Sequence, residues 1–165
     1  MTLIRKYGPL ISIGLIVLAL GFLFLPYVRA GFENRYYAIG YHAIFNIKES
    51  GLTSTTTREG NPSAMLIIAF VLMACSLVAL PFYKKDIILP FISGIALFVA
   101  GIIFFFAHLI LIVNLGGAPI SGTFGLYLVA SLVTLSGAAS FFCGLQGLKE
   151  AQNKAREEGF SYLRK

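Results

Sequence analysis

Residues 87–148 read IILPFISGIALFVAGIIFFFAHLILIVNLGGAPISGTFGLYLVASLVTLSGAASFFCGLQGL and contain no Asp, Glu, Lys or Arg. Two shorter windows without these residues precede this stretch, at 7–28 and 60–83. An α-helix rises about 1.5 Å per residue and the hydrocarbon core of a bilayer is about 30 Å thick, so about 20 apolar residues can cross it. The sequence therefore predicts several transmembrane helices, with charged groups confined to loops and tails.

The composition favours the same interpretation. Hydrophobic residues make up 58% of the 165 residues and charged residues only 12%, whereas soluble domains contain about 25% charged residues. The formal net charge of +6 would suggest nucleic acid as a partner of a soluble domain, but in a membrane protein it first reports which side each loop faces. We therefore expect the lipid bilayer as a partner, and no nucleic acid.

We predict an all-α membrane protein, a four-transmembrane-helix bundle that forms a single domain with a small extracellular β-hairpin in the first loop. The third and fourth spans divide the uncharged stretch, because residues 114–124 have a turn-forming composition. The predicted spans are residues 9–28, 63–83, 87–113 and 125–148, with an outer loop at 29–62 and a cytoplasmic tail at 149–165.

The distribution of Lys and Arg predicts the orientation, because cytoplasmic segments retain these residues. Nine of the 13 Lys and Arg residues lie before the first span, between the second and third spans, or after the fourth span. The other four lie in the first loop. Both the N- and C-termini are therefore expected in the cytoplasm, in a multi-pass protein of the plasma membrane.

An alternative interpretation of the first span is a secretory signal. Arg5 and Lys6 precede an apolar run, and Val28-Arg-Ala30 resembles a small-residue cleavage site. The apolar run is longer than the roughly 7 to 15 residues that such signals contain, which favours a retained span.

Small residues predict where the helices pack, because spans associate in lipid through close approach of their backbones. Glycines seven residues apart occur in the first, third and fourth spans, and the fourth span adds small residues every four positions. Packing within one chain is the favoured interpretation, and a contact with a second copy is the alternative. The predicted packing positions are Gly14, Gly21, Gly94, Gly101, Ser136, Gly137, Ser140 and Gly144.

The first loop is predicted to form the hairpin. Residues 36–47 alternate an aromatic and aliphatic face with a mixed face at strand periodicity. Residues 48–51 have turn composition, and the Thr-rich segment 52–58 suits a partner strand. We expect the aromatic face to pack on the outer end of the bundle, with a surface for a protein partner as the alternative. Its aromatic residues are Tyr37, Tyr41 and Phe45.

His108 lies inside the predicted third span, about five residues from its outer end, and ionisable residues at such places are candidates for function. The favoured interpretation is a neutral imidazole that is hydrogen-bonded to a neighbouring helix or to water, because no predicted span contains a carboxylate. A polar intramembrane site that relays protons or binds a ligand is the alternative.

The residue pattern does not favour an enzyme. His42 and His108 are too few for a haem or di-iron site. Cys75 and Cys143 form no Cys-x-x-Cys motif and are interpreted as small buried hydrophobic residues. Ser and Thr residues in the spans have no adjacent base in the sequence. We predict no catalytic residues, no metal and no cofactor.

The tail is predicted to continue the fourth span as a helix up to Gly159, because glycine is typical of helix C-termini.

These observations favour a non-enzymatic integral membrane protein that acts by protein–protein association, either as an accessory or scaffold subunit of another membrane protein or as a homo-oligomer. One alternative is a small transporter or channel that uses His108. Another is a lipid-modifying membrane enzyme, which would require polar side chains to converge in space.

Overall fold

The computed structural model describes residues 3–30, 36–45, 63–84, 86, 88–114 and 120–162. The described elements are, in chain order, α1 (Leu3–Phe22), β1 (Pro26–Ala30), β2 (Tyr36–Ile39), α2 (Gly40–Phe45), α3 (Ala64–Ala79), the 3-10 helix η1 (Leu80–Lys84), α4 (Ile88–Phe105), α5 (Ala107–Asn114), β3 (Ile120–Gly122) and α6 (Phe124–Tyr162).

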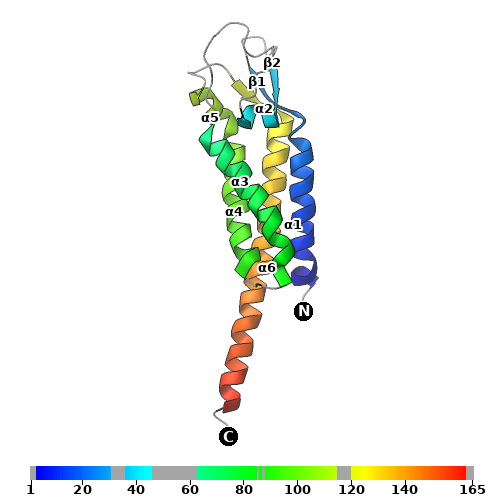
Figure 1. Cartoon of the computed structure of the whole chain (residues 1–165), viewed down its shortest axis with the longest axis vertical. Helices are drawn as coiled ribbons and strands as arrows, with labels where there is room; N and C mark the ends of the chain where they lie inside the picture. The colour runs from blue at the N-terminus through cyan, green and yellow to red at the C-terminus, as the bar shows by residue number, and fades with distance from the viewer. Residues whose placement is uncertain are drawn as a thin grey trace.

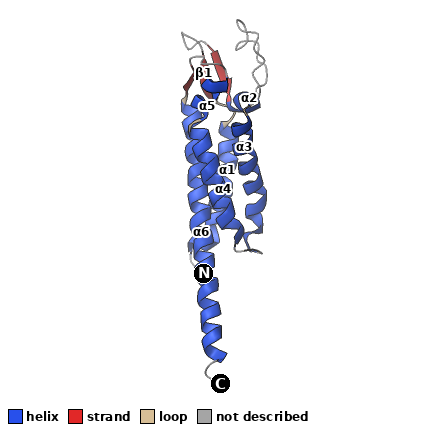
Figure 2. Ribbon diagram, turned by 90° about the vertical axis from the view of Figure 1, so that its left-hand side faces the viewer, coloured by secondary structure: helices blue, strands red, loops and turns tan. Residues whose placement is uncertain are grey.

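The long helices lie side by side and give the molecule an elongated shape (Figure 1). The strands gather at one end of the bundle, and both termini lie toward the other end (Figures 1 and 2). Helix α6 packs against both α1 and α4, and α3 packs against α4. The prediction of a mostly helical chain is therefore confirmed.

Three of the described helical segments are long and apolar enough to cross a membrane: Ala64–Lys84, Ile88–Phe105 and Phe124–Arg156. The apolar part of α1, Tyr7–Phe22, is shorter. These helices are compatible with a membrane-embedded protein.

The first span was predicted to reach residue 28, and this boundary is wrong because α1 ends at Phe22. Pro26 begins a strand, and a proline both lacks a backbone N–H and disfavours the helical conformation of the residue before it. The apolar residues Tyr27 and Val28 are buried in the strand. The run of apolar residues therefore extends beyond the end of α1 because the strand that follows is also buried.

The described strands form a three-stranded sheet with the order β2-β1-β3. Both pairings are antiparallel, and Arg29 of the central strand lies opposite Tyr37 on one side and Ser121 on the other. The first strand of the hairpin was predicted over residues 36–47, but β2 ends at Ile39. Its predicted partner strand, residues 52–58, lies outside the described residues.

Helix α2 replaces the second half of the predicted strand, and Gly40 at its start explains the change of direction. A Cβ atom on Gly40 would lie 2.7 Å from Leu23 Cδ2 and 2.8 Å from the Leu23 carbonyl oxygen. The absence of a side chain therefore lets α2 begin directly against the chain that leaves α1. The alternation of residue types that predicted a strand here carries no information about the contact between Gly40 and Leu23.

The predicted third span is divided into α4 and α5 by Phe106. Backbone hydrogen bonds continue through the break, because the Phe106 N–H donates to the Ile102 carbonyl oxygen and the Phe106 carbonyl oxygen accepts from the Ile110 N–H.

Helix α6 continues through Gly159 to Tyr162, so the predicted helix end at Gly159 is wrong. One glycine costs about 1 kcal/mol in a helix interior, which a helix already nucleated over 39 residues can absorb. The last part of α6 projects beyond the other helices (Figure 1).

Candidate functional site

The contact between α4 and α6 is built on glycines. A Cβ atom on Gly94 would lie 2.6 Å from the Phe141 backbone nitrogen, and a Cβ atom on Gly144 would lie 2.5 Å from the Phe91 backbone nitrogen. Phe91 and Phe141 stack with ring centroids 5.0 Å apart. Because neither glycine has a side chain, the backbone of the opposite helix can approach closely at each position.

Gly101 and Gly137 belong to the same contact. A Cβ atom on Gly101 would collide with Thr134 of α6, and one on Gly137 would lie 2.9 Å from the Phe98 backbone nitrogen of α4. The four glycines of the third and fourth spans that were predicted as packing positions thus lie where these two helices meet.

Ser136 and Ser140 lie on a different face of α6 and contact α1. The Ser12 hydroxyl donates to the Ser136 carbonyl oxygen at 2.9 Å, and the Ser136 hydroxyl donates to the Ser12 carbonyl oxygen at 3.0 Å. The Ser140 hydroxyl donates to the Ser12 hydroxyl oxygen at 2.8 Å. The three side chains are fully buried, so they form a hydrogen-bonded cluster between the two helices. Ser12 was not among the packing positions predicted from the sequence.

Gly14 and Gly21 do not pack against another described element of the same chain. A Cβ atom on either residue would meet nothing within 4 Å, and both residues are exposed. Their spacing was correct for one helix face, but α1 packs on α6 through the face that carries Ser12. Gly14 and Gly21 therefore point away from that contact.

The sheet and α2 together form a cap on the end of the bundle (Figure 2), which we define as residues 26–30, 36–45 and 120–122. Tyr27 and Ile44 are fully buried in it. The Thr123 N–H donates to the Tyr27 carbonyl oxygen at 3.1 Å, and a Cβ atom on Gly125 would lie 2.5 Å from the Pro26 carbonyl oxygen. The start of α6 is therefore held closely against the central strand.

Aromatic residues join α2 to the bundle. The Tyr41 hydroxyl donates to the Leu20 carbonyl oxygen at 3.2 Å, and the Tyr41 ring lies 4.8 Å from Phe24 and 6.1 Å from Phe70, centroid to centroid. The Phe45 ring lies 5.2 Å from the same Phe70 ring. Tyr41 and Phe45 thus contact the bundle, while the side chain of Tyr37 lies outside the described part of the structure.

The Tyr27 hydroxyl is buried without a hydrogen-bond partner among the described residues. Burial raises the pKa of Tyr27 far above its usual range, because an apolar environment disfavours the phenolate. The side chain therefore stays protonated and places one polar O–H group inside the cap.

His108 lies on α5, near the end of the bundle that carries the cap (Figure 1). Its Nδ1 atom is buried and has no hydrogen-bond partner among the described residues. The imidazole lies 6.3 Å from the Tyr127 ring, which in turn lies 5.5 Å from the Phe105 ring. Its ring neighbour among the described residues is thus Tyr127 of α6.

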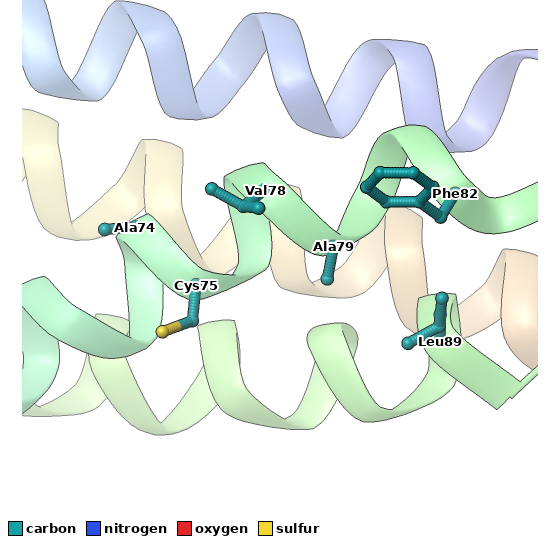
Figure 3. Close-up of a pocket in the computed structure, with 6 residues that line it drawn as sticks. All are labelled: Ala74, Cys75, Val78, Ala79, Phe82 and Leu89. Carbon is teal, nitrogen blue, oxygen red and sulfur yellow. The ribbon is translucent and has the colours of Figure 1, made fainter.

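An apolar groove of about 450 Å³ lies between α3, η1 and the start of α4. Figure 3 shows the lining side chains, with Ala79 and Cys75 on the α3 side and Leu89 on α4. Cys75, expected to be buried, is exposed in this groove, whereas Cys143 is buried. The lining residues are Ala74, Cys75, Val78, Ala79, Phe82 and Leu89.

Among the described residues, no group of three or more His, Cys, Asp or Glu side chains is arranged to hold a metal ion. The chain matches none of the protein-family models and none of the curated proteins with which it was compared.

Proposed function

We propose that this chain is a four-span plasma-membrane protein that acts by association, as an accessory or scaffold subunit whose cap end meets a membrane-protein partner or a second copy. In this proposal α1 supplies the fourth crossing and both termini are cytoplasmic. Support comes from the 20 residues of α1, which span about 30 Å, and from the buried serine cluster that joins α1 to α6.

The observation that carries the proposal is the way the cap is fixed to the bundle. Its strands come from two connections far apart in the sequence, and its hydrogen bonds reach α1 and Thr123, the residue that precedes α6. A surface that is already rigid loses little conformational entropy when it binds. Such a surface is suited to recognition.

Large apolar side chains near the cap end remain exposed. Phe124 at the start of α6 is 76% exposed, Val113 at the end of α5 is 78% exposed, and Phe24 after α1 is 66% exposed. Aromatic side chains are enriched in the central part of protein interfaces. We take Phe124 as the position from which the partner is contacted.

The proposal predicts that a photo-crosslinking residue placed at Phe124 will capture one defined partner, or a second copy, in intact membranes. The matched control is Ile92, which is 57% exposed on α4 and lies away from the cap. We expect a discrete crosslinked band from position 124 and none from position 92, measured by gel shift and mass spectrometry. Identical products from the two positions, or none from position 124, would contradict association through the cap.

A further inference from the structure

We propose that the groove between α3 and α4 binds one acyl chain of an anionic phospholipid, with the lipid headgroup held beside Lys84. The proposal depends on α3 and α4 lying in a bilayer, and it goes beyond association through the cap, which lies at the other end of these helices (Figure 1).

The shape of the groove comes from small side chains on α3. Ala74, Cys75 and Ala79 leave a hollow, and Leu89 of α4 forms the opposite wall (Figure 3). From Ala74 to Phe82 the groove follows about 12 Å of helix. A hollow of this length and narrow section suits a linear hydrocarbon chain.

The chemistry of the groove is that of the acyl region. All six lining side chains are apolar or a thiol. Two of these apolar side chains are exposed at the surface of the helix, Val78 at 68% and Phe82 at 50%. An exposed apolar groove on a helix that is able to cross a membrane faces hydrocarbon.

A cation follows the last lining residue of η1 by two positions in the sequence. Phe82 is followed by Tyr83 and Lys84, whose ammonium group lies 5.9 Å from the centre of the Tyr83 ring. Tyrosine and lysine at the end of a span lie at headgroup level, and a lysine there attracts anionic lipids. The lipid phosphate is the group that meets Lys84.

The carboxylate of Asp86, which is near Lys84 in the sequence, is hydrogen-bonded to the start of α4. Asp86 Oδ1 accepts a hydrogen bond of 2.9 Å from the Ile88 backbone N–H. This contact directs its negative charge at the first turn of α4, where the helix dipole favours it. Asp86 therefore acts on α4 and leaves the attraction between Lys84 and a phosphate group in place.

The chain contains no Trp, so a single introduced tryptophan is the only source of tryptophan fluorescence. The reporter is Phe82→Trp, with Val78→Trp as a second reporter at the exposed rim. The control reporter is Ile92→Trp, on α4 but outside the groove. Full-length protein is reconstituted with increasing fractions of phosphatidylglycerol or phosphatidylcholine that carry brominated acyl chains, and tryptophan quenching gives the relative affinity of each lipid.

We expect the groove reporters to favour phosphatidylglycerol about fivefold, the size of effect expected of one cation near a phosphate. Lys84→Gln should bring the ratio of the two lipid affinities close to one. Ala79→Leu should lower the quenching by both lipids, because the larger side chain fills the groove. The Ile92→Trp reporter should show no preference.

Equal quenching by the two lipids at the groove reporters, or a preference that survives Lys84→Gln, would overturn the proposal. Protection of both groove reporters from every brominated lipid would also overturn it, because a protein helix would then cover the groove.

Discussion

Gly144→Leu is expected to destabilise the fold by more than about 3 kcal/mol, beyond the range of ordinary overpacking. Even a Cβ atom at this position would lie 2.5 Å from the Phe91 backbone nitrogen and 2.6 Å from Phe91 Cα. These are backbone atoms, so relief requires α4 and α6 to separate along their contact. Unfolding in a denaturing detergent, followed by circular dichroism, measures the loss.

The matched control is Gly14→Leu, which introduces the same side chain into another helix. A Cβ atom there meets nothing within 4 Å, so a change within about 0.5 kcal/mol is expected. If the two glycine variants were equally stable, the α4–α6 contact would be wrong. If Gly144→Leu instead left the monomer folded and abolished only self-association, Gly144 would belong to a contact between copies.

Ser12→Leu is the second large effect and should cost about 2 to 3 kcal/mol. Ser12 is fully buried between α1 and α6. Leucine would remove the Ser12 hydroxyl, which donates to the Ser136 carbonyl oxygen and accepts from the Ser140 hydroxyl, and it would add volume where the helices touch. The same denaturing-detergent titration measures this effect, and Gly14→Leu is again the control because it lies on the same helix.

The polar part of this effect can be separated from the steric part. Ser12→Ala should cost about 1 kcal/mol, typical of hydrogen bonds between helices in membranes. A double-mutant cycle of Ser12→Ala with Ser140→Ala should show less than additive losses, since the two hydroxyl groups bond to each other. Full additivity would show that the bond contributes nothing to stability.

The helices could be predicted from the sequence because hydropathy is a local property. The sheet could not be predicted in full, since its central strand pairs with β3 from a connection about 90 residues later. Such pairing is decided by tertiary contacts that no local pattern encodes. The same limit explains α2, where Gly40 fits against Leu23 and the strand periodicity of its sequence is overridden.

The packing positions show what residue spacing can and cannot decide. Seven-residue spacing returns to the same helix face, but it does not identify what that face meets. Gly137 and Gly144 meet α4, whereas a Cβ atom on Gly14 or Gly21 would have no neighbour within 4 Å in the described part of the chain. Ser136 lies one residue before Gly137, which is about 100° around the helix, and it meets α1 instead.

The groove could not be found from the sequence, because it depends on the distance between two helices. Ala74, Cys75 and Ala79 form a hollow only where Leu89 faces them (Figure 3). The exposed position of Cys75 follows from the same arrangement. The sequence suggested burial because an unpaired cysteine in an apolar span resembles any small core residue.

The central claim is that the chain crosses the membrane four times, with the cap on one side and both termini on the other. Single cysteines at Thr2, Ser121 and Lys154, in a background in which Cys75 and Cys143 are alanine, test it by labelling with a membrane-impermeant maleimide. In intact cells we predict labelling of the cysteine at 121 alone, with the other two labelled only after permeabilisation. Positions 121 and 154 in the same compartment would contradict the account, as would positions 2 and 154 in different ones.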